Sequence, residues 1–126
     1  MKKVLIIEDD EQISRVYGIK LKQEGIETIN AADGEEGLKK IISDKPDVVL
    51  LDLMLPGKDG FWVLEELSKK PQLKNIPVIV LSNLGQKTDQ ERAMKLGAKD
   101  YLVKADTSIK EVVDKIKGFL SDRGRS

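Results

Sequence analysis

Short apolar runs alternate with amphipathic segments along the whole chain. Five runs predict strands, at residues 4–7 (VLII), 28–31 (TINA), 48–51 (VVLL), 78–81 (VIVL) and 101–103 (YLV). Four of these runs are apolar at almost every position, as expected for strands of a parallel sheet that is covered by helices on both faces. These four runs end at polar residues, so the pattern places polar side chains where the strands leave the core.

Between the strands, apolar residues recur every three or four positions, which predicts amphipathic helices. Three pairs in which a Glu follows a potential capping residue by three positions indicate helix starts: Asp33 with Glu36, Thr88 with Glu91, and Ser108 with Glu111. Gly25, Pro46 and Gly97 fit helix ends. The predicted inward faces are Ile13, Val16, Tyr17 and Leu21; Leu38, Ile41 and Ile42; Phe61, Val63, Leu64 and Leu67; Ala93 and Leu96; and Ile109, Val112, Val113, Ile116, Phe119 and Leu120.

Strand followed by helix, repeated five times, predicts a doubly wound α/β fold. We expect the flavodoxin-like (βα)5 arrangement, a five-stranded parallel sheet in the order 2-1-3-4-5 with helices on both faces. A chain of 126 residues suits one domain. We assign residues 1–120 to it and interpret residues 121–126 (SDRGRS) as a polar tail, either a linker stub or an expression scar.

Composition narrows the available chemistry. The chain has no Cys and no His, which excludes disulfides, thiolate or imidazole metal ligands and histidine general acid–base catalysis. The 22 basic and 22 acidic residues balance, so no overall field favours nucleic acid or an anionic membrane. The N-terminal apolar run is too short for a signal peptide or a membrane span. We therefore expect a cytoplasmic protein that does not bind nucleic acid directly or associate with membranes.

Five polar residues are predicted to meet at one edge of the sheet. Glu8 and Asp9 follow the first strand, Asp52 ends the third, Ser82 the fourth and Lys104 the fifth. The carboxyl ends of parallel strands share an edge, and ligands bind at this edge where the winding direction reverses, between the first and third strands. The three carboxylates are expected in that crevice.

These residues suit the formation of an aspartyl phosphate. Three carboxylates at short range repel one another unless a cation intervenes, and Mg²⁺, with Mn²⁺ as a substitute, prefers such oxygen ligands together with a backbone carbonyl after Asp52. Asp52 would then be the nucleophile, while the metal and Lys104 neutralise the transferred phosphoryl group and Ser82 binds it. An ionised carboxylate needs no histidine to activate it.

The motifs around these positions match a known family. The chain resembles the receiver domain of two-component response regulators through IIEDD after the first strand, LLDLMLPGKDG at the third, VIVLSN at the fourth and DYLVKA at the fifth. The resemblance implies that Asp52 accepts a phosphoryl group from a phosphohistidine of a sensor histidine kinase or phosphotransfer protein. It also implies that Asp9 binds Mg²⁺ directly, Glu8 through water and Met54 through its backbone carbonyl.

The resemblance further assigns the response to phosphorylation. Ser82 takes the place of the switch Ser/Thr, Lys104 that of the phosphate-pairing lysine and Tyr101 that of the switch aromatic. The surface formed by the last two helices and the strand between them would then change and control binding of a downstream protein, with the chain a monomer or a phosphorylation-dependent homodimer. Two positions depart from the family pattern: Ala105 replaces a proline that often follows the lysine in a cis bond, and Asn83 replaces a small residue.

Other interpretations remain at this point. A phosphatase of the haloacid dehalogenase type would need an acid where Met54 stands, and a flavodoxin-like cofactor site would need a phosphate loop where the chain has EDDEQ. A receiver-shaped binding module that acts independently of phosphorylation is the main alternative. Ser82 as a turn residue and Tyr101 as a partly buried core aromatic are the competing interpretations for those two positions.

Overall fold

Strands and helices alternate along the chain in the computed structural model, which describes residues 1–124. This part of the chain forms five strands, five α-helices and two short 3-10 helices. The strands are β1 (Lys3–Ile7), β2 (Glu27–Ala31), β3 (Val48–Leu51), β4 (Val78–Ser82) and β5 (Asp100–Val103). The helices are α1 (Glu11–Gln23), α2 (Gly34–Asp44), α3 (Gly60–Ser68), η1 (Pro71–Leu73), α4 (Lys87–Lys95), η2 (Lys104–Asp106) and α5 (Ile109–Gly124).

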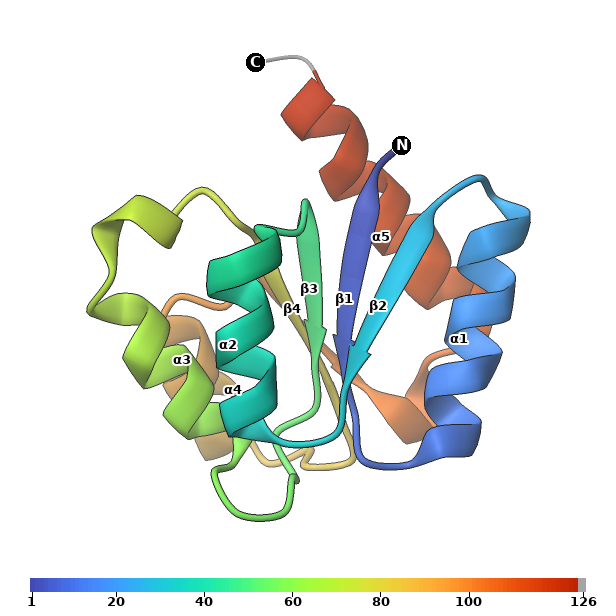
Figure 1. The fold of residues 1–126 in the computed structure, drawn as a ribbon. Coiled ribbons are helices and arrows are strands. Elements are labelled where there is room, and N and C mark those ends of the chain that lie inside the picture. Colours follow the sequence, from blue (N-terminus) through green and yellow to red (C-terminus); the bar gives the residue numbers. More distant parts are fainter. Residues whose placement is uncertain (125–126) are drawn as a thin grey trace.

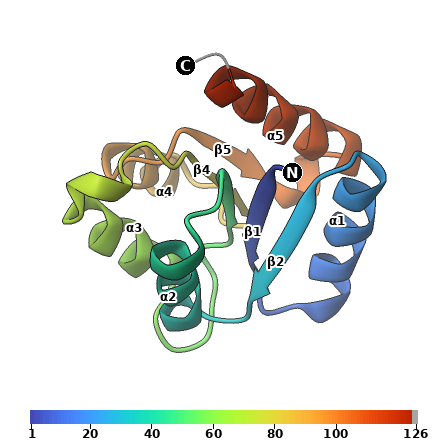
Figure 2. The ribbon, with the colours of Figure 1, turned by 45° about the horizontal axis from the view of Figure 1, so that its top comes forward.

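The five strands form one parallel sheet in the order β2-β1-β3-β4-β5, which confirms the predicted flavodoxin-like α/β fold. Helices α1 and α5 cover one face, and α2, α3 and α4 cover the other (Figures 1 and 2). The winding direction reverses between β1 and β3, as expected for this strand order.

Alternating residues of the buried strands supply two hydrophobic clusters, one on each face of the sheet. In β1, Leu5 and Ile7 pack toward α2, α3 and α4, while Val4 and Ile6 pack toward α1 and α5. This alternation follows from the two-residue period of a strand. Because both faces are covered, β1, β3 and β4 are buried almost throughout, which explains their apolar sequences.

Two of the three predicted capping pairs are confirmed. The Asp33 carboxylate accepts a hydrogen bond from the Glu36 N–H at 2.8 Å, and Ser108 and Glu111 each accept a bond from the other's backbone N–H at 3.1 Å. The prediction for Thr88 is wrong. Helix α4 begins at Lys87 with Gln86 as its N-cap residue, so Thr88 already lies in the first helical turn, where its backbone no longer has the extended conformation of a cap.

Three apolar residues predicted to face inward are exposed: Val16, Ile42 and Ile109. Val16 and Ile42 each adjoin a buried apolar residue in the same helix, and consecutive helical side chains point about 100° apart, so only one of each pair reaches the core. Ile109 is the first residue of α5 and precedes the turn that packs on the sheet.

Helix α5 extends to Gly124, past the end of the predicted domain at residue 120. The last two residues of the predicted polar tail lie outside the described residues. Among residues 1–124, no helix is both long enough and apolar enough to cross a membrane.

Candidate functional site

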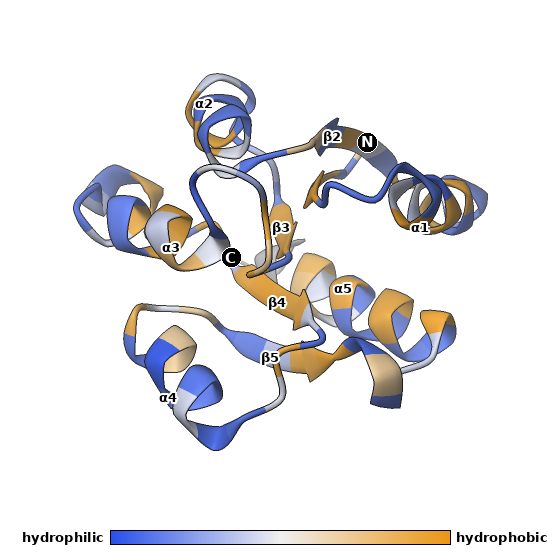
Figure 3. Cartoon of the chain, turned by 90° about the horizontal axis from the view of Figure 1, so that it is seen from below, coloured by the Kyte–Doolittle hydropathy of each residue, from blue (hydrophilic) through white to orange (hydrophobic). Residues whose placement is uncertain are grey.

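The carboxyl ends of the strands form the edge of the sheet that faces the viewer in Figure 3, where hydrophilic loops surround the apolar strands. Parallel pairing sets Ile7 of β1 beside Leu51 of β3, so the residues that follow them, Glu8 and Asp52, are neighbours across the reversal point. The backbone fixes both: the Asp52 N–H donates to the Ile7 carbonyl at 3.0 Å, and the Glu8 N–H donates to the Ala31 carbonyl at 3.0 Å.

Glu8, Asp9 and Asp52 form an acidic cluster at this point. Each offers one carboxylate oxygen, and these oxygens all lie within 4.8 Å of one another. Glu8 and Asp52 are buried, whereas Asp9 is exposed, so the cluster is open to solvent on one side. Three hard oxygen donors at this spacing fit a divalent cation such as Mg²⁺, and the acidic cluster is typical of the Mg²⁺ site of receiver domains.

Lys104 joins the two buried carboxylates. Its ammonium lies 2.7 Å from Asp52 Oδ2 and also donates to Glu8 Oε1, and only 15% of its side chain is exposed. Burial raises the pKa of Glu8, and the hydrogen bonds that it accepts from Lys104 and from the Asp10 N–H only partly offset this effect. Burial lowers the pKa of Lys104, but its bonds to Asp52 and Glu8 outweigh burial and leave the pKa above its ordinary value.

The third acid of the sequence run, Asp10, has a different role. Its carboxylate caps α1 by accepting hydrogen bonds from the N–H groups of Gln12 and Ile13. The Asp10 carboxylate is therefore engaged in the start of α1, directly after the residues Glu8 and Asp9 of the acidic cluster. On the other side, the Met54 N–H donates to Asp52 Oδ1 at 3.0 Å, which orients the Asp52 carboxylate, while the Met54 side chain is 54% exposed.

Ser82 and Tyr101 both contact the loop that follows β4. Ser82 is fully buried at the end of β4, next to Val103 of β5, and its hydroxyl accepts a hydrogen bond from the Leu84 N–H at 3.3 Å. The Tyr101 hydroxyl donates to the Leu84 carbonyl. Burial raises the pKa of the Tyr101 phenol, so the hydroxyl keeps the proton that it donates. The two side chains thus bind the same loop residue, one at its N–H and the other at its carbonyl.

The two departures from the family pattern, Ala105 and Asn83, directly follow Lys104 and Ser82. No cis peptide bond occurs within residues 1–124, so Lys104 and Ala105 are joined in trans at the start of η2. Asn83 is exposed, next to the buried Ser82.

Two glycines near the site have a role that the sequence pattern did not reveal. A Cβ on Gly60 would lie 2.5 Å from the Asp52 carbonyl oxygen, and a Cβ on Gly34 would lie 2.3 Å from the Lys58 carbonyl oxygen. The Gly60 N–H donates to the Leu53 carbonyl and the Gly34 N–H to the Lys58 carbonyl, so the loop after Asp52 is bound closely at both positions. In the sequence these glycines are visible only as breakers, because close approach leaves no periodic signal.

Comparison with known proteins identifies the family. The profile of the response regulator receiver domain matches residues 4–117, nearly the whole chain. The chain belongs to the response regulator receiver domain family. Receiver domains are signalling phosphoacceptors of two-component systems rather than classical enzymes, and they partner with histidine kinases. The acidic pocket of Glu8, Asp9 and Asp52 in this receiver domain is consistent with a phosphoacceptor site.

Relatives support the same assignment. The probable transcriptional regulator ycf27 of Cyanophora paradoxa is 40% identical over 119 residues, which cover 94% of this chain and 48% of the relative, so the chain spans about half of that protein's length. The Francisella response regulator 1452 receiver domain superimposes with a TM-score of 0.88 at 33% identity, covering 98% of this chain and 99% of that one. The BeF3-activated N-terminal receiver domain of Klebsiella pneumoniae RstA has a TM-score of 0.85 at 28% identity, with coverage of 94% and 98%.

Proposed function

We propose that this receiver domain is a phosphoacceptor switch in which Asp52 accepts a phosphoryl group from a phosphohistidine of a sensor histidine kinase or phosphotransfer protein. A carboxylate oxygen of Asp52 bonds to phosphorus as the P–N bond breaks, and the electron pair leaves with the imidazole of the donor. The observation that carries this proposal is the contact of a buried carboxylate, Asp52, with the Lys104 ammonium at 2.7 Å inside an acidic cluster.

The residues around Asp52 have distinct roles in this proposal. Lys104 balances the charge of the Asp52 carboxylate before transfer and the charge of the phosphoryl oxygens after it. Asp9 and Asp52 would hold Mg²⁺ directly, Glu8 through water and Met54 through its backbone carbonyl, with Mn²⁺ as a substitute. The bound cation supplies positive charge that neutralises the carboxylates and the phosphoryl group. The Met54 N–H, bonded to Asp52 Oδ1, holds the carboxylate in a fixed orientation.

The response to phosphorylation begins in the loop after β4. Ser82 and Tyr101 both bind Leu84, so movement of the Ser82 hydroxyl toward a phosphoryl group on Asp52 would break one of the bonds that hold this loop. The loop leads into α4, and Tyr101 lies in β5. We therefore propose that the surface of α4, β5 and α5 changes and controls binding of a downstream protein, either as a monomer or as a phosphorylation-dependent homodimer.

Intact-mass spectrometry after incubation with acetyl phosphate tests the proposal. We expect a single phosphoryl adduct on the wild-type protein with Mg²⁺, a large reduction when a chelator is present, and no adduct on Asp52→Asn. Asp114→Asn, which changes an exposed aspartate on α5, is the matched control and should be phosphorylated like the wild type. An adduct on Asp52→Asn would refute the assignment. A folded wild-type protein that binds Mg²⁺ but takes no phosphoryl group from acetyl phosphate or from a phosphorylated kinase would favour the phosphorylation-independent binding module.

A further inference from the structure

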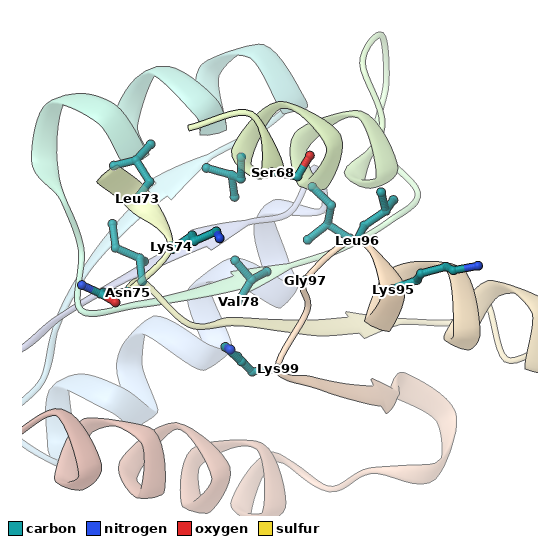
Figure 4. A pocket seen from close by; sticks show the side chains of 12 residues that line it. Ser68, Leu73, Lys74, Asn75, Val78, Lys95, Leu96, Gly97 and Lys99 are labelled. Atoms are coloured by element: carbon teal, nitrogen blue, oxygen red, sulfur yellow. The ribbon is translucent and has the colours of Figure 1, made fainter. Parts of the chain in front are cut away.

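A groove lies between α3, η1 and the end of α4, at the edge of the sheet opposite the acidic cluster. The groove is open to solvent and has a volume of about 540 Å³, within the range of protein-bound ligand sites, and Figure 4 shows the residues that line it. Strand β4 begins at the groove with Val78, and β5 begins there with Asp100, directly after Lys99. The phosphoacceptor site lies at the opposite, carboxyl ends of the strands. The groove is therefore separate from the phosphoacceptor site.

Small residues at two helix ends leave this space open. Ser68 is the last residue of α3, and its hydroxyl donates to the Glu65 carbonyl at 2.6 Å, so the side chain folds back on its own helix. Gly97 follows α4 with a φ of 112°, and a Cβ there would meet no atom within 4 Å. The glycine conformation ends α4, and the next residue, Ala98, is buried and donates its N–H to the Ala93 carbonyl.

The floor of the groove is apolar and has a fixed backbone. Leu73 and Val78 are buried there and Leu96 lies beside them (Figure 4), and Leu67, Ile76 and Leu96 are only partly buried. Hydrogen bonds from the Leu73 N–H to the Lys70 carbonyl and from the Ile76 N–H to the Leu73 carbonyl define the turns of this segment, and the buried Leu73 side chain anchors it to the core. A partner would therefore meet a preformed site and would not have to order it on binding.

The charge at the groove has one sign. Lys74, Lys95 and Lys99 come from three different segments, and no acidic residue lines the groove in the described part of the chain. None of the three lysines forms an ion pair within residues 1–124, although other exposed lysines of the molecule do. Figure 4 shows Lys74 directed over the groove and Lys95 directed outward at its rim.

We propose that this groove binds an acidic amphipathic segment of a partner protein, most simply a helix whose leucine-type side chains enter the groove while its carboxylates pair with Lys74 and Lys99. A single protein segment can supply apolar groups that pack on the floor of the groove and carboxylates that pair with its lysines. Nucleic acid would supply phosphates without an apolar anchor, so the apolar floor favours a protein. Because the groove does not involve Asp52, we expect the partner to bind Asp52→Asn as it binds the wild type. The result therefore tests this proposal independently of the phosphoacceptor proposal.

Backbone amide NMR with a synthetic peptide tests this site. The probe is a capped helical peptide with leucines at i, i+3 and i+4 and glutamates on its other faces. We expect saturable shift changes confined to residues 64–78 and 95–99, weakened by added salt. Lys74→Glu and Lys99→Glu should each raise Kd roughly three- to tenfold, because each change removes an exposed ion pair and introduces like-charge repulsion of similar size. The control Lys39→Glu, which changes an exposed lysine of α2, should leave Kd unchanged.

Several outcomes would overturn the proposal. These are absence of saturable shifts at the groove, equal weakening by Lys39→Glu, or equal binding of a peptide in which lysines replace the glutamates. Tighter binding of a single-stranded oligonucleotide at the same residues would assign the groove to nucleic acid. Shifts of the same residues that depend on protein concentration without peptide would assign it to a second copy of the chain.

Discussion

Lys104→Met tests whether this lysine acts as the built-in cation of the acidic cluster. The substitution keeps the length and apolar part of the side chain but removes the charge that pairs with Asp52 at 2.7 Å and with Glu8. Removing one partner of a buried ion pair costs about 3–5 kcal/mol, because the remaining charge is left unpaired. Here the cluster opens to solvent at Asp9, and burial already raises the pKa of Glu8, so proton uptake can relieve part of the repulsion. We therefore expect a loss of about 2–3 kcal/mol in the free energy of unfolding.

Urea denaturation in the presence of EDTA measures this loss. Lys115→Met is the matched control, since Lys115 pairs with Asp100 at 3.0 Å but is 53% exposed, and its removal should cost under about 1 kcal/mol. With Mg²⁺, the Lys104→Met protein should regain most of its stability and bind the cation more tightly than the wild type, because no ammonium competes for the carboxylates. The reasoning is refuted if both variants lose equal stability in EDTA, or if Mg²⁺ stabilises wild type and Lys104→Met equally.

Two further pairs of variants test the close approach of Gly60 and the helix caps. Gly60→Ala should cost about 1–3 kcal/mol and weaken Mg²⁺ binding, since its Cβ would lie 2.5 Å from the Asp52 carbonyl oxygen. Gly118→Ala, in open space on α5, should instead stabilise by about 0.5–1 kcal/mol, and urea denaturation that ranks the two alike would contradict this view. Ser108→Ala should cost about 1 kcal/mol through loss of the cap, whereas Thr88→Ala should change stability by under about 0.5 kcal/mol; an equal loss of Tm in both would show that Thr88 caps α4 after all.

The placement of the acidic cluster was predictable because it depends on strand order alone. Apolar runs mark the strands, and parallel strands bring their carboxyl ends to one edge, so Glu8 and Asp52 had to be neighbours once the order 2-1-3-4-5 was inferred. The acidic run after β1 holds a third carboxylate, Asp10, which strand order alone does not separate from Glu8 and Asp9. The structure separates them, because the Asp10 carboxylate accepts hydrogen bonds from the first N–H groups of α1, whereas Glu8 and Asp9 belong to the acidic cluster.

Contacts that depend on the reach of individual side chains were not predictable. The pairing of Lys104 with both Glu8 and Asp52 joins residues far apart in the sequence, and no hydrophobic pattern encodes which carboxylate a lysine reaches. The two Ser/Thr-x-x-Glu pairs show that short-range contacts are also hard to predict from the sequence. Ser108 caps α5, but Thr88 does not cap α4, because Gln86, two residues before Thr88, has the extended backbone of the cap and the helix begins at Lys87.

The balanced composition does not reveal that charges of one sign gather at particular places on the molecule. Equal numbers of acidic and basic residues exclude a strong overall field, but they do not exclude local concentrations of one charge. Acidic side chains gather at the carboxyl ends of β1 and β3, while Lys74 and Lys99 lie at the opposite edge, beside a groove without acidic residues in the described chain. Exposed charges further apart than about 10 Å are largely screened at physiological salt, so a local concentration of charge can act independently of the net charge. A net charge of zero is therefore compatible with a cation site at one edge and an acidic partner at the other.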